Sequence, residues 1–220
     1  MVEISPSLLS ANFSNLQKDL DELKRSKVKY IHLDIMDGEF VPNISFGFPI
    51  IKSIRKGNDF IFDTHLMIEE PIRYIEEFKK SGSDIIVVHY EACSNLNETI
   101  DAIKACGLKA GLSFKPKTNL DEVIKYLDKI DLCLIMSVEP GFGGQSFMEE
   151  SIEKIKRIRK YIDDNNLSCL IEVDGGIKTY NLRKVIDAGV DLVVSGSDIF
   201  SNKDNTIYEQ VNKYRQIINQ

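Results

Sequence analysis

Short apolar runs alternate with amphipathic segments along the whole chain. Some of these runs are apolar without a break, such as Ile85–Val88 and Leu192–Val194. Continuous runs of this length are typical of strands that are buried on both faces of a parallel sheet. The pattern predicts strands at Val2–Leu9, Tyr30–Asp37, Phe60–Met67, Asp84–Tyr90, Lys109–Phe114, Asp131–Val138, Leu170–Asp174 and Asp191–Ser195.

Helical patterns fall between these runs. Pro71 is suited to a helix start, and Gly189 is suited to the C-cap of a helix over Tyr180–Ala188. Apolar residues recur three or four positions apart, as on one helix face, in the stretches 16–23, 72–78, 152–162 and 207–218. The helical pattern is weaker over 48–55 and 95–105.

Repeated strand–helix units over 220 residues predict a single-domain (β/α)8 TIM barrel spanning residues 1–220. A doubly wound open sheet is the alternative architecture. Such a sheet usually carries Gly-x-Gly-x-x-Gly after its first strand, where this chain has Ser10-Ala11-Asn12-Phe13. The barrel is therefore the favoured α/β fold.

Composition and charge narrow the function classes. With 43% hydrophobic residues the chain can build a large core, and its net charge of −6 without a basic stripe argues against nucleic-acid binding. We expect no signal peptide and no membrane span, because no apolar stretch approaches the about 18 residues that a span needs. The four cysteines are scattered and form no C-x-x-C pair. We therefore expect reduced thiols and a cytoplasmic protein.

The second predicted strand carries two polar residues on one face. Alternation makes His32 and Asp34 point the same way, and a buried carboxylate needs a partner. In a barrel the strands' C-terminal ends form the active site, and there the third strand supplies His65 and the seventh Asp174. Two imidazoles and two carboxylates suit a divalent metal ion, zinc first, with iron, manganese or cobalt as alternatives. A purely hydrogen-bonded structural role for His32 and Asp34 is the competing interpretation.

Glycine-rich segments follow the last three predicted strands, at 139–145, 174–176 and 195–197. Glycine lets backbone N–H groups approach a ligand, and barrel loops seven and eight commonly bind phosphate with the start of a short extra helix. We expect Gly176, Gly196 and Ser197 to bind phosphate, with Asp198–Ser201 as that helix. Tight turns at strand ends are the alternative. The long loop after strand six is expected to act as a lid.

Two further sets of residues end predicted strands. Met36, Met67 and Met136 are expected to form a polarisable, water-poor floor around the reacting atoms, although methionine more often only fills core gaps. The third histidine of the chain, His89, ends the fourth strand. We expect it to be a hydrogen-bonded structural residue.

Two carboxylates beside one metal ion suit proton transfer on and off carbon. The ion would stabilise the enediolate that forms when a proton leaves the carbon next to a carbonyl group. Asp34 and Asp174 would lie on opposite faces of that planar intermediate. Removing a proton from one face and returning it to the other inverts the configuration. The predicted reaction is therefore epimerisation of a phosphorylated sugar next to its carbonyl group.

The chain resembles the ribulose-phosphate 3-epimerase family, which interconverts D-ribulose 5-phosphate and D-xylulose 5-phosphate in the pentose phosphate pathway. The resemblance rests on motifs in order along nearly the whole chain: Ser5–Ala11, His32–Gly38, Phe40–Gly47, Thr64–Met67, Val138–Gln145, Glu172–Ile177 and Ser195–Ser197. It implies that His32, Asp34, His65 and Asp174 bind the metal, that Asp34 and Asp174 are the catalytic acid/base pair, and that the protein forms homo-oligomers.

The resemblance also bears on substrate binding. It implies sugar-phosphate contacts from Ser7 and from the glycine-rich loops. With the site residues inferred above, the candidate substrate-binding set is Ser7, His32, His65, Met136, Gly141, Phe142, Gly143, Gly144, Asp174, Gly175, Gly176, Gly196 and Ser197. Two positions depart from the family pattern. Asn12 stands where an acidic residue is common, and Asp198 where a small apolar one is common. Because Asp198 would bring negative charge near the phosphate, we expect its side chain to point away.

Three rival functions remain. A D-allulose 6-phosphate 3-epimerase would share the metal and both aspartates and would differ only around the sugar. A lyase of the related decarboxylase barrels would carry Asp-x-Lys-x-x-Asp on strand three, where this chain reads Asp63-Thr64-His65 without a lysine. A non-enzymatic role would expect a gap in the four-residue metal set, and there is none.

Overall fold

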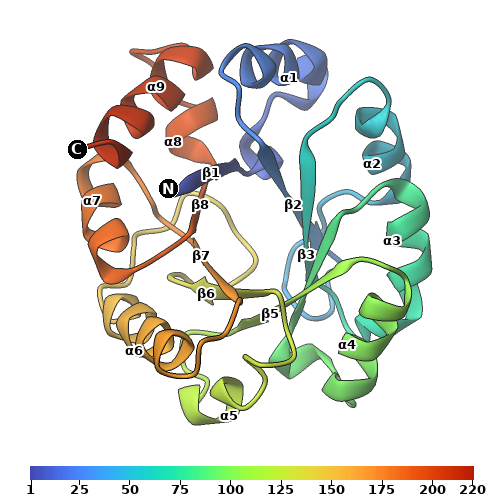
Figure 1. Cartoon of the computed structure of the whole chain (residues 1–220). Helices are drawn as coiled ribbons and strands as arrows, with labels where there is room; N and C mark the ends of the chain where they lie inside the picture. Colours follow the sequence, from blue (N-terminus) through green and yellow to red (C-terminus); the bar gives the residue numbers. More distant parts are fainter.

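A computed structural model describes residues 1–220 and shows eight parallel strands that curl into a barrel (Figure 1). The sheet order is β1-β8-β7-β6-β5-β4-β3-β2, and a bridge between Ser7 and His32 joins its two edges. The closed parallel sheet confirms the barrel and excludes the open doubly wound alternative. The strands are β1 Glu3–Pro6, β2 Tyr30–Met36, β3 Ile61–Met67, β4 Ile85–His89, β5 Lys109–Phe114, β6 Leu132–Met136, β7 Leu170–Asp174 and β8 Leu192–Ser195.

The helices form a ring outside the strands (Figure 1). Gly189 adopts a left-handed φ of 109° at the end of the helix α7 (Thr179–Ala188), as its predicted C-cap role requires. None of the helices is long and apolar enough to cross a membrane. The helices are α1 Leu16–Arg25, α2 Phe48–Arg55, α3 Ile75–Ser81, α4 Leu96–Ala105, α5 Leu120–Ile124, α6 Ser151–Asp164, α7 Thr179–Ala188, α8 Ser197–Phe200 and α9 Ile207–Ile218.

Some predicted boundaries were wrong. The first strand was predicted to reach Leu9, but the chain turns at Ser7, whose hydroxyl accepts from the Leu9 N–H and begins a 3-10 turn over Leu8–Ser10. Pro71 likewise begins a 3-10 turn that leads into α3. The extra helix starts and ends one residue earlier than predicted. Five of the other seven strands are one to three residues shorter than predicted, because flanking residues such as Asp84, Asp131 and Asp191 lie just outside the strands.

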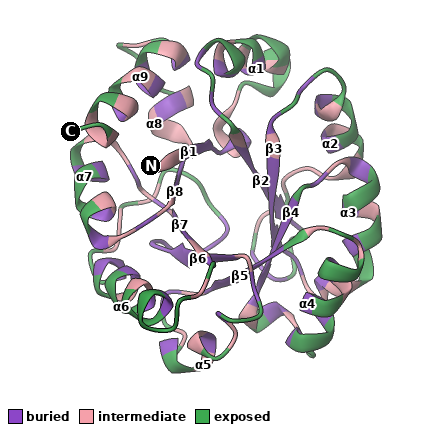
Figure 2. Cartoon of the chain, in the orientation of Figure 1, coloured by how far each residue is buried: buried purple, intermediate pink, exposed green.

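The main apolar core lies between the barrel and the helices, where most strand residues and the inner faces of the helices are buried (Figure 2). A smaller apolar cluster on the inward strand faces, including Ile85, Leu132 and Leu192, fills part of the barrel interior. Polar side chains such as His32, His65 and Glu172 occupy the rest of the interior and are fully buried. Because burying them without partners costs free energy, their arrangement is the place to look for function.

Candidate active site

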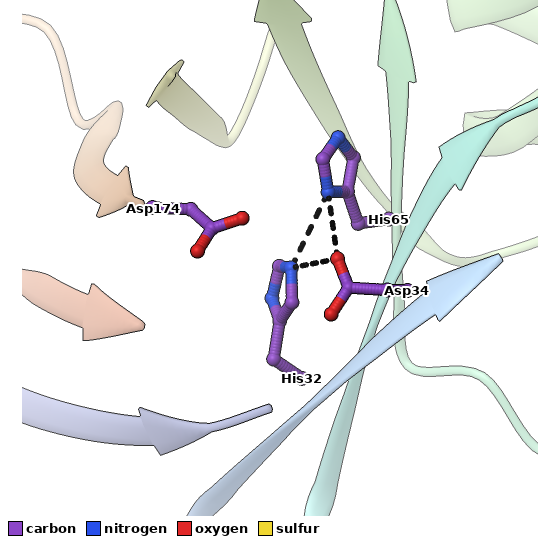
Figure 3. A group of neighbouring side chains, drawn as sticks. All are labelled: His32, Asp34, His65 and Asp174. Atoms are coloured by element: carbon purple, nitrogen blue, oxygen red, sulfur yellow. Dashed lines mark hydrogen bonds and ion pairs between the residues drawn. The ribbon is translucent and has the colours of Figure 1, made fainter. Parts of the chain in front are cut away.

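The four predicted metal-site residues meet inside the barrel. His32, Asp34, His65 and Asp174 each offer one ligand atom, and these atoms lie within 4.8 Å of one another. The register of β2 and β3 sets Asp34 beside His65, and alternation makes all four side chains point inward. Figure 3 shows Asp174 facing the other three residues from β7, on the other side of the site.

Three of these residues form a compact triangle. Asp34 Oδ1 lies 3.3 Å from His65 Nδ1 and 3.4 Å from His32 Nε2, and the two ring nitrogens are 3.4 Å apart (Figure 3). The other carboxylate oxygen of Asp34 accepts a 2.5 Å hydrogen bond from the Ser7 hydroxyl. The triangle therefore collects two ring nitrogens and a carboxylate oxygen at one point.

The two carboxylates differ in pKa. Burial raises the pKa of Asp34, but His32 and His65 outweigh it and hold the pKa well below its usual range. Asp174 is partly exposed toward the pocket, yet the loss of hydration and the charge of Asp34 raise its pKa to about 6. Asp34 is thus a carboxylate at neutral pH, whereas Asp174 can carry a proton.

A second polar layer lies beneath the triangle and was missed by sequence reasoning. His32 Nδ1 lies 2.5 Å from Asp63 Oδ2 and 3.9 Å from Glu172 Oε1, and all three residues are fully buried. Burial and the neighbouring Asp63 charge raise the pKa of Glu172 well above its usual range. Strand alternation could have identified both carboxyl groups, because residues two apart on a strand face the same way. Asp63 lies two residues before His65, and Glu172 lies two residues before Asp174.

A pocket opens above the cluster. Its lining includes every predicted substrate contact except His32 and His65, which lie below it and have no exposed surface. Met36 and Met67 line it together with Met136, and a water-poor floor around the reacting atoms stays a prediction. Sequence reasoning missed Ser10, which reaches the pocket because the chain turns after β1.

The glycines after β7 and β8 are packed so closely that side chains would not fit. A Cβ on Gly176, whose φ is +65°, would lie 2.4 Å from the Phe147 nitrogen, and one on Gly196 would lie 2.6 Å from Ser10 Oγ. Asp198 points away from these loops, as expected, because its Oδ2 accepts from Tyr214 and Gln210 of α9 at 2.9 and 2.8 Å. No carboxylate of this segment therefore competes with an anion at the glycines.

The loop between β6 and α6 covers one side of the pocket. Asn43 Nδ2 donates to the Gly141 carbonyl at 2.8 Å, and Gln145 Nε2 donates to the carbonyls of Glu139 and Phe142. The Phe142 side chain remains 54% exposed. Asn43 therefore ties the loop to the segment after β2, and Gln145 closes the loop on itself, while the aromatic residue is free to contact a ligand.

The fold and the site together define a class of protein: TIM-barrel enzymes with a polar cluster at the C-terminal strand ends. Among solved structures, KGPDC from Streptococcus mutans matches with a TM-score of 0.74 at 13% identity, covering 100% of this chain and 98% of that one. The 3-hexulose-6-phosphate synthase from Salmonella typhimurium matches with a TM-score of 0.72 at 16% identity, covering 100% and 99%. At this identity the matches show the fold alone.

Sequence comparison is more specific. The profile of the ribulose-phosphate 3 epimerase family matches residues 3–200. The ribulose-phosphate 3-epimerase of Bacillus subtilis is 43% identical over 205 residues, covering 93% of this chain and 94% of that protein. That of Synechocystis is 45% identical over 202 residues, covering 91% and 88%. The chain belongs to the ribulose-phosphate 3-epimerase family and is an enzyme that epimerises a carbohydrate.

Proposed function

We propose that this chain, as one catalytic domain over residues 1–220, inverts C3 of D-ribulose 5-phosphate to give D-xylulose 5-phosphate with the help of a divalent metal ion. The observation that carries the proposal is the convergence of Asp34 and Asp174 with two histidines below a glycine-lined pocket. This reaction belongs to the pentose phosphate pathway. The four cysteines are unpaired, which supports a cytoplasmic location.

The donor set supports the metal site. His32 Nε2, His65 Nδ1 and the Asp34 and Asp174 carboxylates are within reach of one ion, and two nitrogens with two carboxylate oxygens suit zinc, or else iron, manganese or cobalt. Asp34 and Asp174 repel one another at this distance, which helps to raise the pKa of Asp174. A bound cation would relieve that repulsion. When bound, it supplies positive charge that stabilises an enediolate.

The proton transfers are carried out by the chain's own carboxylates. Asp34, kept ionised by its histidine neighbours and held by the Ser7 hydroxyl, takes a proton from the substrate carbon. Asp174, which can carry a proton, returns one to the opposite face, and the configuration inverts. In the reverse reaction the two residues exchange roles. Asp34 and Asp174 come from β2 and β7, which are not neighbours in the barrel, and both line the pocket, so they can reach the sugar from different sides.

The substrate would be held from the rim of the pocket. Backbone N–H groups of Gly176, Gly196 and Ser197 are proposed to bind the phosphate, while the loop over Gly141–Gly144 covers the sugar. The methionines keep water from the reacting carbon. The expected binding partners are therefore small sugar phosphates. Family resemblance also implies a homo-oligomer, which remains a proposal that sedimentation velocity can test.

A coupled assay tests the function. Purified protein is given D-ribulose 5-phosphate or D-allulose 6-phosphate, before and after removal of metal with a chelator. We expect a higher kcat/KM for the five-carbon substrate, loss of activity on chelation, and recovery with Zn²⁺ or Co²⁺. A higher kcat/KM for the six-carbon substrate would contradict the substrate assignment. Full activity in protein shown by elemental analysis to be metal-free would contradict the metal role.

A further inference from the structure

The pocket of the candidate site offers no positive side chain to a phosphate group. None of its lining residues is a lysine or an arginine, and three of them, Asp34, Glu139 and Asp174, are acidic. A phosphate monoester carries a charge of about −1.5 to −2 at pH 7 and has three strong acceptor oxygens. N–H and O–H donors of the lining must therefore satisfy those oxygens, and each free donor counts.

Most side-chain donors of the pocket are already used within the chain. They belong to four serines and one glutamine: Ser7, Ser10, Gln145, Ser195 and Ser197. A serine hydroxyl has a single proton to donate. Ser7 gives its proton to the Asp34 carboxylate at 2.5 Å, and Ser195 donates to the Ile177 carbonyl at 3.1 Å. Both amide N–H groups of Gln145 are taken up by carbonyl groups of its own loop.

Two hydroxyl groups of the lining remain without a partner in the chain, those of Ser10 and Ser197. Ser197 already belongs to the proposed phosphate site. Ser10 is partly exposed toward the pocket, and its only hydrogen bond is made by its backbone N–H, which donates to the Ser7 carbonyl at 3.3 Å. The Ser10 hydroxyl is therefore a free donor that the proposed function leaves unused.

Backbone pairing holds Ser10 beside a glycine of the proposed phosphate site. The Ser7 N–H donates to the Ser195 carbonyl at 3.1 Å, which fixes the turn over Leu8–Ser10 against the end of β8. Gly196 follows directly, and a Cβ at this position would lie 2.6 Å from Ser10 Oγ. The hydroxyl thus occupies space that any larger residue at position 196 would fill.

The same hydroxyl also lies near the loop after β6. A Cβ on Gly143 of that loop would lie 3.8 Å from Ser10 Oγ. Ser10 Oγ is therefore placed between two loops that are both proposed to hold the substrate. An anion bound by the backbone N–H of Gly196 is within reach of this hydroxyl, whereas the hydroxyl of Ser7, at the start of the same turn, is directed to Asp34.

We propose that the Ser10 hydroxyl donates a hydrogen bond to the phosphate group of the substrate. The inference rests on the proposed function and adds a side-chain donor to its phosphate site. A hydrogen bond to a charged acceptor is roughly twice as strong as one between neutral groups. The phosphate does not react, so this contact is made equally in the bound substrate and in the transition state, and its loss raises KM at unchanged kcat.

Three variants separate this role from a structural one. Ser10→Ala removes the hydroxyl, and Ser10→Thr retains it. Ser53→Ala makes the same change as Ser10→Ala at an exposed position of α2 outside the pocket. Because Ser10 Oγ has no partner in the chain, Ser10→Ala should unfold at the same temperature as the wild type. A clearly lower thermal midpoint would assign the hydroxyl to the fold and overturn the proposal.

The assay measures KM and kcat for D-ribulose 5-phosphate and the competitive inhibition constant of inorganic phosphate. Inorganic phosphate fills the phosphate site without contacting the sugar site. In Ser10→Ala we expect KM and the inhibition constant to rise together, by about 10–100-fold, at nearly unchanged kcat. Ser10→Thr should recover most of both, and Ser53→Ala should match the wild type.

Four kinetic results would overturn the proposal. The first is an unchanged inhibition constant of phosphate in Ser10→Ala. The second is a fall in kcat at unchanged KM, which would mean that Ser10 acts on the loop after β6. The others are a loss in Ser10→Thr equal to that in Ser10→Ala, and a loss of the same size in Ser53→Ala.

The proposed function fails in a different way. Wild-type protein that prefers D-allulose 6-phosphate would refute the substrate assignment, yet the same comparison would still test Ser10, because both substrates carry the phosphate. Wild-type protein that epimerises neither would refute the function, and line broadening of inorganic phosphate in ³¹P NMR would then compare wild type with Ser10→Ala. An active wild type with an unaffected Ser10→Ala would refute only the role of Ser10.

Discussion

Replacing Asp174 by Asn should separate proton removal from inversion. An amide of the same shape neither takes nor returns a proton, so Asp174→Asn blocks transfer at one face of the substrate. No other carboxyl group can replace it, since Asp63 is bonded to His32 and Glu172 has no exposed surface. We therefore expect the full general acid/base contribution to be lost, about 10²–10⁴-fold in kcat, or about 3–5 kcal/mol in the activation barrier.

The assay follows hydrogen exchange as well as epimerisation. Each 5-phosphate epimer is incubated in D₂O, and deuterium at C3 is measured by NMR. Asp34 remains able to act in Asp174→Asn, so this variant should exchange the C3 hydrogen of one epimer only, without inverting it. Asp34→Asn is the matched variant and should exchange the hydrogen of the other epimer only. Metal content is measured in both, because each residue is also a proposed ligand.

One result would refute the two-base reasoning. If metal-loaded Asp174→Asn exchanged both epimers, or inverted either within tenfold of the wild-type rate, a single base would have to serve both faces. Loss of exchange from both epimers in a metal-loaded variant would equally contradict independent roles for the two carboxylates.

Two further predictions address the loops and the C-terminal helix. Gly176→Ala would set a Cβ 2.4 Å from the Phe147 nitrogen. We expect kcat/KM to fall at least about tenfold, mainly through a higher KM, which corresponds to about 1.4 kcal/mol of lost transition-state stabilisation. Gly57→Ala is the control, with a similar φ of +77° but open space around the Cβ, and should leave the kinetics unchanged, whereas an unchanged KM in Gly176→Ala would contradict the phosphate assignment. Tyr214→Phe removes a buried hydroxyl that contacts Asp198 and should cost about 1–3 kcal/mol in free energy of unfolding at neutral pH. Because burial raises the pKa of Tyr214 above its unfolded value of about 10, the unfolded chain loses its proton first and wild-type stability falls as pH rises above about 10. The difference between wild type and Tyr214→Phe should therefore narrow by about 1 kcal/mol between pH 10 and 11 in denaturant titrations, and a constant difference would be inconsistent with a neutral buried phenol.

Much of this protein could be predicted from local sequence patterns. The bounds of β5 and β7 agree with the apolar runs, and the end of α7 at Gly189 agrees with its C-cap chemistry. The inward direction of His32 and Asp34 also followed from alternation along one strand. These features depend on backbone periodicity and on the conformations open to single residues, which nearby sequence is sufficient to define.

The partners of the site residues depended on distant parts of the chain. Asp63 and Glu172 have the same parity as the predicted ligands, but only the barrel register brings both to His32 Nδ1. The side chain of Asp198 was expected to point away from the phosphate-binding loops, but the sequence did not indicate what would bind it. Its hydrogen-bond donors, Tyr214 and Gln210, lie on α9, which follows it in the chain. Contacts of this kind arise when elements pack, and no local pattern specifies them.

The sequence by itself therefore determined the strands, the faces of their side chains and the four residues that could share a metal ion. The tertiary structure decided how the two edge strands of the sheet meet to close the barrel and which nitrogen of His65 faces the Asp34 carboxylate. The reason is that side-chain direction follows from the local period of the backbone, whereas hydrogen-bond partners are set by register and closure across strands far apart in the chain.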